Sequence, residues 1–178
     1  MKQDLNKNIK AQIQVLAYYQ ILGGVMGIGL IVWLGFQSNI FLSLGLLILL
    51  FVIGLYSFSI YCGYNLLNYT NRESFRLSAI NQALQILSFM LLGFSYKYIA
   101  GVEFAVGVNL TNEALFTFDF SFFTSEFQMN LNTEKETTKI AINIIPILIM
   151  YFIGKLEQKV ETGEPIPTIE ESNILDSF

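Results

Sequence analysis

Residues 15–36, VLAYYQILGGVMGIGLIVWLGF, run for 22 residues without a charged side chain. At a rise of 1.5 Å per residue, a helix of this length crosses roughly 30 Å of hydrocarbon. Two further uncharged runs, residues 40–61 and 77–96, are long enough for the same purpose. The sequence therefore predicts three membrane-spanning helices. The first run is longer than the core of a signal peptide, so we expect it to remain as a signal anchor.

A fourth apolar run, residues 140–153, is shorter and contains Pro146. Upstream, Thr133 and Glu136 match the capping box that begins many helices. We therefore predict one membrane-crossing helix over residues 133–162. Pro146 would weaken this helix by removing a backbone hydrogen bond, giving a static kink or, alternatively, a gating hinge.

The composition excludes several classes of function. Hydrophobic residues make up 53% of the 178-residue chain and charged residues only 13%, whereas about 25% is usual in soluble domains. The chain has no His and a single Cys, Cys62, so it lacks the usual proton shuttle and any thiolate metal cage. A net charge of −4 argues against nucleic-acid binding. We predict a non-enzymatic membrane protein without catalytic residues, metal site or cofactor.

Charge placement predicts the orientation in the membrane. Basic residues flank the predicted helices in three segments: Lys2, Lys7 and Lys10; Arg72 and Arg76; and Lys155 and Lys159. Residues 97–139 carry three Lys but six acidic residues. By the positive-inside rule, both termini are cytoplasmic and residues 97–139 are extracytoplasmic. We expect the protein to be integral to the inner membrane of a bacterium.

The insert between the third and fourth predicted helices alternates apolar and polar residues in three consecutive segments. A period of two is typical of strands with one apolar face. Polar breaks at residues 111–113 and 124–125 predict hairpin turns. Residues 100–132 therefore predict a three-stranded antiparallel meander. Its apolar face is the candidate interaction surface, with Phe104, Phe116, Phe118, Phe120, Phe122 and Phe127 as the candidate residues.

Polar side chains recur at helical spacing in the third predicted helix. These residues are Ser78, Asn81, Gln82, Gln85 and Ser88. Polar side chains in lipid need partners, so this stripe should face other helices. It is either a hydrophilic conduit or small-ligand site, or a set of hydrogen bonds that fixes helix packing. We favour packing because transport sites usually include a charged residue within the membrane.

Two glycines in the first predicted helix, Gly23 and Gly27, form a small-xxx-small pair that lets helices approach closely. A contact within the chain and a contact between copies are equally compatible with this motif. Residues 163–178 are acidic and contain two prolines, which predicts a mostly disordered cytoplasmic tail. Three apolar residues in this tail, Ile174, Leu175 and Phe178, are candidate anchors for a cytoplasmic partner.

The predicted fold is an all-α four-helix transmembrane bundle with a small extracytoplasmic β-meander. Residues 1–99 hold helices one to three, 100–132 the meander, 133–162 helix four and 163–178 the tail. Lipid is the first expected partner, and a homo-oligomer or a complex with another membrane or cytoplasmic protein is the second. The leading hypothesis is an oligomeric scaffold or sensor subunit, for example in signalling or phage defence. The alternatives are a homo-oligomeric pore with shared β-structure and an obligate small subunit of a larger complex.

Overall fold

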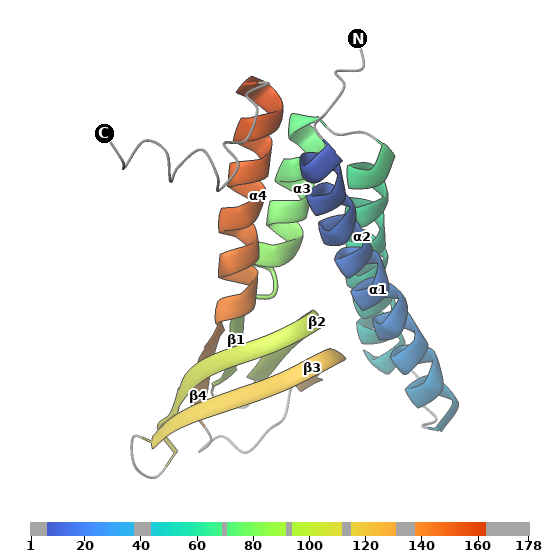
Figure 1. The fold of residues 1–178 in the computed structure, drawn as a ribbon. Coiled ribbons are helices and arrows are strands. Elements are labelled where there is room, and N and C mark those ends of the chain that lie inside the picture. Colours follow the sequence, from blue (N-terminus) through green and yellow to red (C-terminus); the bar gives the residue numbers. More distant parts are fainter. Residues whose placement is uncertain are drawn as a thin grey trace.

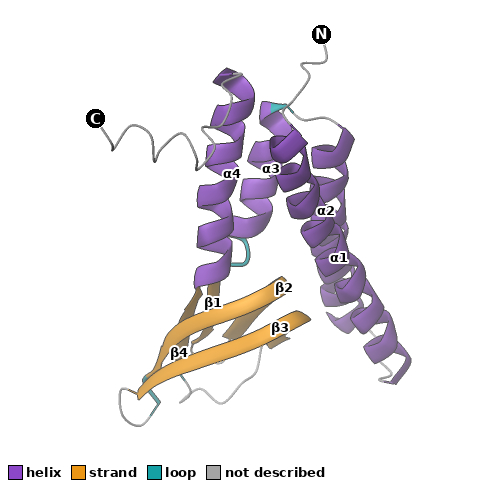
Figure 2. Cartoon of the chain, viewed as in Figure 1, coloured by secondary structure: helices purple, strands orange, loops and turns teal. Residues whose placement is uncertain are grey.

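The computed structural model describes residues 7–37, 44–68, 71–91, 94–111, 115–130 and 138–162. The elements are α1 (Lys7–Gln37), α2 (Leu44–Asn68), α3 (Arg72–Ala83), β1 (Leu87–Leu91), β2 (Phe94–Asn109), β3 (Leu115–Asn130), β4 (Lys139–Asn143) and α4 (Ile144–Thr162). The sheet lies beneath α3 and α4 and beside the lower halves of α1 and α2 (Figure 1). Helices α3 and α4 therefore lie at the end of the molecule opposite to the sheet, whereas α1 and α2 run from that end down along the side of the sheet (Figure 2).

Among the described helices, two are long and apolar enough to cross a membrane. They comprise Lys7–Trp33 in α1 and Leu46–Asn68 in α2, with mean hydropathies of 1.9 and 2.2. Only 39% and 28% of their most apolar windows are buried within the protein, whereas the core helix of a soluble protein is mostly buried. The first two predicted spans thus meet the test for a membrane helix, and a four-span bundle is not confirmed.

The third predicted helix, residues 77–96, is wrong as a single element. Helix α3 ends at Ala83, and after a turn the chain continues as β1 and then β2. The length of an uncharged run does not distinguish a helix from strands. Here the strand state prevails because β1 pairs with both β2 and β4, which satisfies its backbone groups.

The fourth predicted helix, residues 133–162, is also shorter than expected. Residues 139–143 form strand β4, and α4 begins only at Ile144. Pro146 is therefore the third residue of α4 and sits in its first turn, where a missing N–H has no helical partner to lose. The predicted kink at Pro146 is wrong for this reason. The capping residues Thr133 and Glu136 lie outside the described residues.

The sheet is antiparallel and closes on itself. Its strand order is β1-β4-β2-β3, and β1 also pairs with the beginning of β2. Residues 94–96 of β2 pair with β1, whereas residues 105–109 pair with β4. Because β1 and β4 pair with each other, these three strands form a ring. The predicted three-stranded meander is therefore wrong in strand number. Its last two predicted strands are one continuous strand, β3, that pairs with β2 throughout.

Gly101 lies where β2 bends. Its φ angle of +133° is one that only glycine adopts readily. The register with β3 shifts between Gly101 and Glu103, which marks a bulge. A Cβ atom on Gly101 would also lie 2.5 Å from the hydroxyl oxygen of Tyr19 in α1. The bend thus depends on glycine for its conformation and for its close approach to α1.

The two faces of the closed sheet have opposite chemistry. Strand pairing places Lys97 beside Gln128, Glu103 beside Ser121 and Ala105 beside Asp119 on the inner face. The outer face pairs Phe104 with Phe120, Val106 with Phe118 and Val108 with Phe116. The outer side chains of β3 are strongly exposed, with Phe116, Phe118 and Phe120 showing 77%, 70% and 61% of their surface. The sheet is polar inside and apolar outside, the reverse of a soluble barrel.

Two apolar clusters hold the helices and the sheet together. The first joins all four helices at the end away from the sheet: Ile9, Ile13, Leu16, Ala17, Leu66, Phe75, Ile153 and Leu156. The second joins α1 and α2 to β2: Ile31, Val52, Tyr56, Tyr98 and Ala100. Within the second cluster, the Tyr56 hydroxyl donates to the Ile99 carbonyl and the Tyr98 hydroxyl to the Leu55 carbonyl, at 3.2 and 3.1 Å. The sheet is thereby fixed to the α1–α2 hairpin.

Candidate functional site

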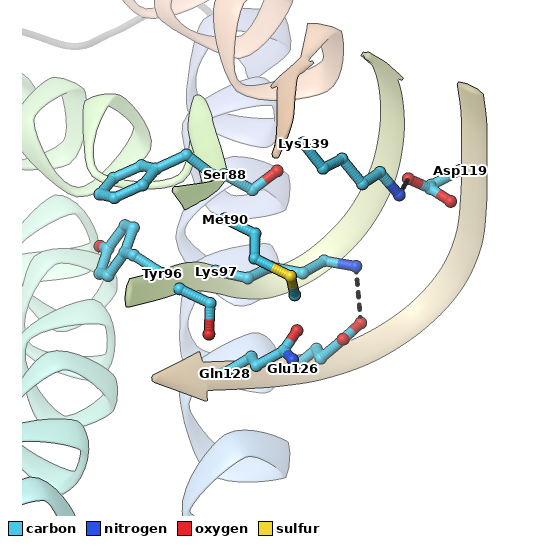
Figure 3. A pocket seen from close by; sticks show the side chains of 10 residues that line it. Ser88, Met90, Tyr96, Lys97, Asp119, Glu126, Gln128 and Lys139 are labelled. Atoms are coloured by element: carbon cyan, nitrogen blue, oxygen red, sulfur yellow. Dashed lines mark hydrogen bonds and ion pairs between the residues drawn. The ribbon is translucent and has the colours of Figure 1, made fainter. Parts of the chain in front are cut away.

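A cleft of about 250 Å³ opens on the inner face of the sheet (Figure 3). All four strands contribute to its lining: Ser88, Phe89, Met90, Ser95, Tyr96, Lys97, Asp119, Glu126, Gln128 and Lys139. The charged residues converge on this cleft because they occupy inner positions of β2, β3 and β4. The alternation seen in the sequence placed the acidic residues on one face, but not their lysine partners.

Lys97 is the most enclosed cation of the cleft. Its Nζ lies 3.0 Å from a carboxylate oxygen of Glu103 and 2.9 Å from one of Glu126. The Glu103 side chain is only 3% exposed, and its other oxygen accepts a hydrogen bond from the Ser121 hydroxyl at 3.0 Å. Glu126 is 44% exposed and reaches toward Lys97 from the facing strand (Figure 3). Lys97 therefore neutralises one buried and one exposed carboxylate.

A second ion pair closes the other end of the cleft. Lys139 Nζ in β4 donates to a carboxylate oxygen of Asp119 in β3 at 2.8 Å, across the intervening strand β2. The pair crosses β2 at small residues, since Ala105 is opposite Asp119 and Gly107 is opposite Ala141. A Cβ atom on Gly107 would lie 2.6 Å from the Ala141 Cβ atom. Small side chains at these positions therefore keep the inner face clear.

The polar stripe predicted at residues 78–88 leads to this cleft. Its first three members, Ser78, Asn81 and Gln82 in α3, are fully buried, and Gln85 in the following turn is 2% exposed. Ser88, the last member, is in β1 and lines the cleft. The stripe therefore bends from a helix into a strand, and it connects the helical end of the molecule with the charged cleft.

Hydrogen bonds link the middle of the stripe to both long helices and to the sheet. The Asn81 amide nitrogen donates to Gln20 Oε1 in α1 and to Ser59 Oγ in α2, both at 3.1 Å. The Gln85 amide nitrogen donates to the Asn81 carbonyl, and its oxygen accepts from the Ala100 backbone N–H at 2.9 Å. These bonds join α3 and the turn after it to both long helices and to β2.

Other polar atoms along the stripe are buried without a hydrogen-bond partner among the described residues. They are Gln20 Nε2, Ser78 Oγ, Asn81 Oδ1, both amide atoms of Gln82, and Asn143 Nδ2. A buried polar group without a partner costs about 1–3 kcal/mol. Such groups are usually satisfied by internal water. Packing alone therefore does not account for the stripe.

Asn143 is the last residue of β4, directly before α4, and it lies beside the turn that joins α3 to β1. Its backbone N–H donates to the Ile86 carbonyl at 2.7 Å, joining the β4–α4 junction to the turn after α3. Its side-chain oxygen accepts from the N–H groups of Phe104 and Ile145, at 3.0 and 3.3 Å. Asn143 was not among the residues singled out from the sequence. Its position at a strand-to-helix junction gives no local signal.

The two candidate glycines of α1 make contacts within the chain. A Cβ atom on Gly23 would lie 2.5 Å from the Ala100 carbonyl oxygen of β2, and one on Gly27 would meet the ring of Tyr56 in α2. Ser125 in β3 also donates a 2.7 Å hydrogen bond to the Gly23 carbonyl. The small-xxx-small motif therefore serves intramolecular packing against two different elements.

The Phe residues of the predicted interaction surface lie in different environments in the structure. Phe104 is 37% exposed and is in edge-to-face contact with Phe120, with ring centroids 6.2 Å apart. Phe127 instead packs against Phe51 of α2 and Tyr96 of β2, so it belongs to the helix contact. The side chain of Phe122 lies outside the described part of the structure, as do the tail residues Ile174, Leu175 and Phe178.

The chain matches no protein-family model, and neither curated proteins nor solved structures include a significant match.

Proposed function

We propose that the protein forms a polar conduit through the cytoplasmic membrane. The observation that carries this proposal is the reversed chemistry of the sheet, with exposed Phe side chains outside and ion pairs inside. Side chains alternate in this way in barrels that face lipid and enclose water. The conduit consists of the charged cleft and the stripe of buried polar residues that leads away from it.

The packing of the sheet on α1 and α2 supports a location at membrane depth. Gly23 and Tyr56, which contact β2, are near the middle of the two candidate spans. If α1 and α2 cross the bilayer, the bend of β2 lies near the midplane and the rest of the sheet lies toward one surface. The exposed Phe116, Phe118 and Phe120 then face the lipid of that leaflet.

The distribution of basic residues orients the molecule. The basic residues at the helix ends away from the sheet are Lys7, Lys10, Arg72, Arg76, Lys155 and Lys159. By the positive-inside rule this end is cytoplasmic, and the sheet lies in the outer leaflet. The one salt bridge described between these ends joins Arg72 to Glu157 at 3.5 Å, and the Arg72 side chain is 82% exposed, where cytoplasmic water would reach it.

The changes from helix to strand between α3 and β1, and from strand to helix between β4 and α4, also favour a conduit. In this placement α3 and β1 cross the bilayer together, as do β4 and α4. Non-helical backbone at membrane depth is tolerated where it is buried in protein or lines a water-filled cavity. The two junctions are joined by the hydrogen bond from the Asn143 backbone N–H to the Ile86 carbonyl, where the stripe reaches the cleft. Discontinuous helices at the bilayer midplane form substrate sites in many transporters.

A proteoliposome experiment tests the conduit. We expect the purified full-length chain to raise the permeability of liposomes to at least one of four probes (water, urea, K⁺ or Cl⁻), in proportion to the protein-to-lipid ratio. Replacing Ser88, where stripe and cleft meet, with Leu should reduce this permeability. The control is Leu87→Val on the outer face of the same strand, which should not change it. Liposomes that stay as tight as protein-free ones toward all four probes would contradict the proposal.

A second candidate function, a non-conducting oligomeric scaffold or sensor subunit, is favoured by the edge of β3. Among the described strands, β3 pairs only with β2, so it is the edge strand of the sheet as described. A long apolar edge strand is a template for pairing with another chain. Native mass spectrometry of the solubilised protein distinguishes the cases, because a scaffold of this kind requires a defined oligomer and a single-chain conduit does not.

A further inference from the structure

We infer that the polar stripe of α3 carries water and small uncharged solutes, and excludes ions. This inference rests on the proposed conduit and concerns what passes along the stripe. The stripe runs from Ser78 in α3 to Ser88 in the cleft, and Asn81 in its middle is hydrogen-bonded to Gln20 and Ser59 of the neighbouring helices. None of these residues is charged, whereas the cleft at its outer end contains two lysines and two carboxylates.

The unpartnered atoms of the stripe include both hydrogen-bond donors and acceptors. Gln20 Nε2, Gln82 Nε2 and Asn143 Nδ2 can only donate, whereas Asn81 Oδ1 and Gln82 Oε1 can only accept. The Ser78 hydroxyl can do both. A dehydrated cation needs a shell of acceptors, and an anion needs a shell of donors. A mixed lining suits a molecule that donates and accepts, such as water, urea or a short polyol.

Burial makes this part of the path unfavourable for ions. Ser78, Asn81, Gln82 and Gln20 are fully buried. An ion that enters such a section loses its water, and the neutral lining provides no opposite charge in return. Phe75 of α3, together with Leu156 of α4, belongs to the buried apolar cluster at the helical end of the molecule, which offers an ion no polar partner. The charged residues of the cleft do not lower this barrier for an ion, because Lys97 and Lys139 are already neutralised by carboxylates of the protein.

Gln82 offers the sharpest test because its side chain is fully buried and both amide atoms lack a partner among the described residues. Gln82→Leu removes two polar atoms at nearly constant volume. If the amide contacts transient water, this variant loses water permeability but keeps or raises its melting temperature. If the amide had a purely structural role, the melting temperature would fall instead. Ile80→Leu, two residues earlier at a 43% exposed position, is the matched control.

The experiment measures osmotic shrinkage of proteoliposomes by stopped-flow light scattering, together with KCl flux on the same vesicles. We expect the full-length chain to accelerate shrinkage while KCl flux stays at the level of protein-free vesicles. Gln82→Leu should abolish the acceleration, and Ile80→Leu should preserve it. Equal rises in water and KCl flux would overturn the inference and leave the conduit standing. Unchanged water permeability in Gln82→Leu would overturn the assignment to the stripe. No rise for any probe would overturn the conduit itself.

Discussion

Replacing Lys97 with Met is expected to lower the free energy of unfolding by about 3–5 kcal/mol, the usual cost of removing one partner from a buried ion pair. The variant leaves the Glu103 carboxylate, 3% exposed, with the Ser121 hydroxyl as its described partner. For a chain of this size the melting temperature should fall by roughly 6–20 °C. Thermal unfolding of the detergent-solubilised protein measures this fall.

Two further variants show whether the unpaired carboxylate causes the loss. Lys139→Met breaks the pair with Asp119, in which the side chains are 34% and 38% exposed, so it should cost only about 0–1 kcal/mol. Adding Glu103→Gln to Lys97→Met removes the unpaired charge and should recover part of the loss. If Lys97→Met and Lys139→Met lowered the free energy of unfolding equally, the ion pair between Lys97 and Glu103 would not be the buried one of the cleft.

Replacing Gly23 with Ala is expected to weaken the docking of α1 on the sheet. The added Cβ atom would lie 2.5 Å from the Ala100 carbonyl oxygen and 2.6 Å from its carbon. Both are backbone atoms of a paired strand, so neither can rotate away. Overpacking of this kind costs about 1–3 kcal/mol, more than the approximately 1 kcal/mol of helix propensity that Ala gains over Gly.

Gly29→Ala is the matched control, six residues later in the same helix. Apart from its chain neighbours and the backbone of its own helix, no atom of the described residues lies within 4 Å of the position that its Cβ atom would occupy. The control should therefore be neutral or stabilising, and the melting temperature of Gly23→Ala should lie several degrees below it. If the two variants had the same melting temperature, the contact between Gly23 and Ala100 would not be part of the fold in solution.

The α1–α2 hairpin and the central strands could be predicted from local pattern. Helices α1 and α2 follow from uncharged runs of sufficient length, and the alternation around Phe104 and Phe118 indicated β2 and β3. The strand β1 was not predicted, because its sequence LSFML has a single polar residue, Ser88, and therefore no alternation. It also lies within an uncharged run of 20 residues, which favours a membrane helix.

The site itself could not be predicted from the sequence, because it depends on contacts between distant residues. The stripe on α3 was visible, but its continuation into the cleft requires the break at residues 84–86 and the bend at Gly101. Lys139 meets Asp119 only because β4 pairs with β2 on the side opposite to β3. That pairing depends on the three-dimensional closure of the sheet, for which no local pattern exists.

The central claim, that the outer face of the sheet lies in lipid, is tested most directly by the environment of Phe118. A single tryptophan at this position, as Phe118→Trp in a Trp33→Phe background, reports its surroundings in liposomes, since Trp33 is the only native tryptophan. The account predicts blue-shifted emission that brominated lipids quench and aqueous iodide does not. Red-shifted emission that iodide quenches and brominated lipids leave unchanged would place the face in water and contradict the account.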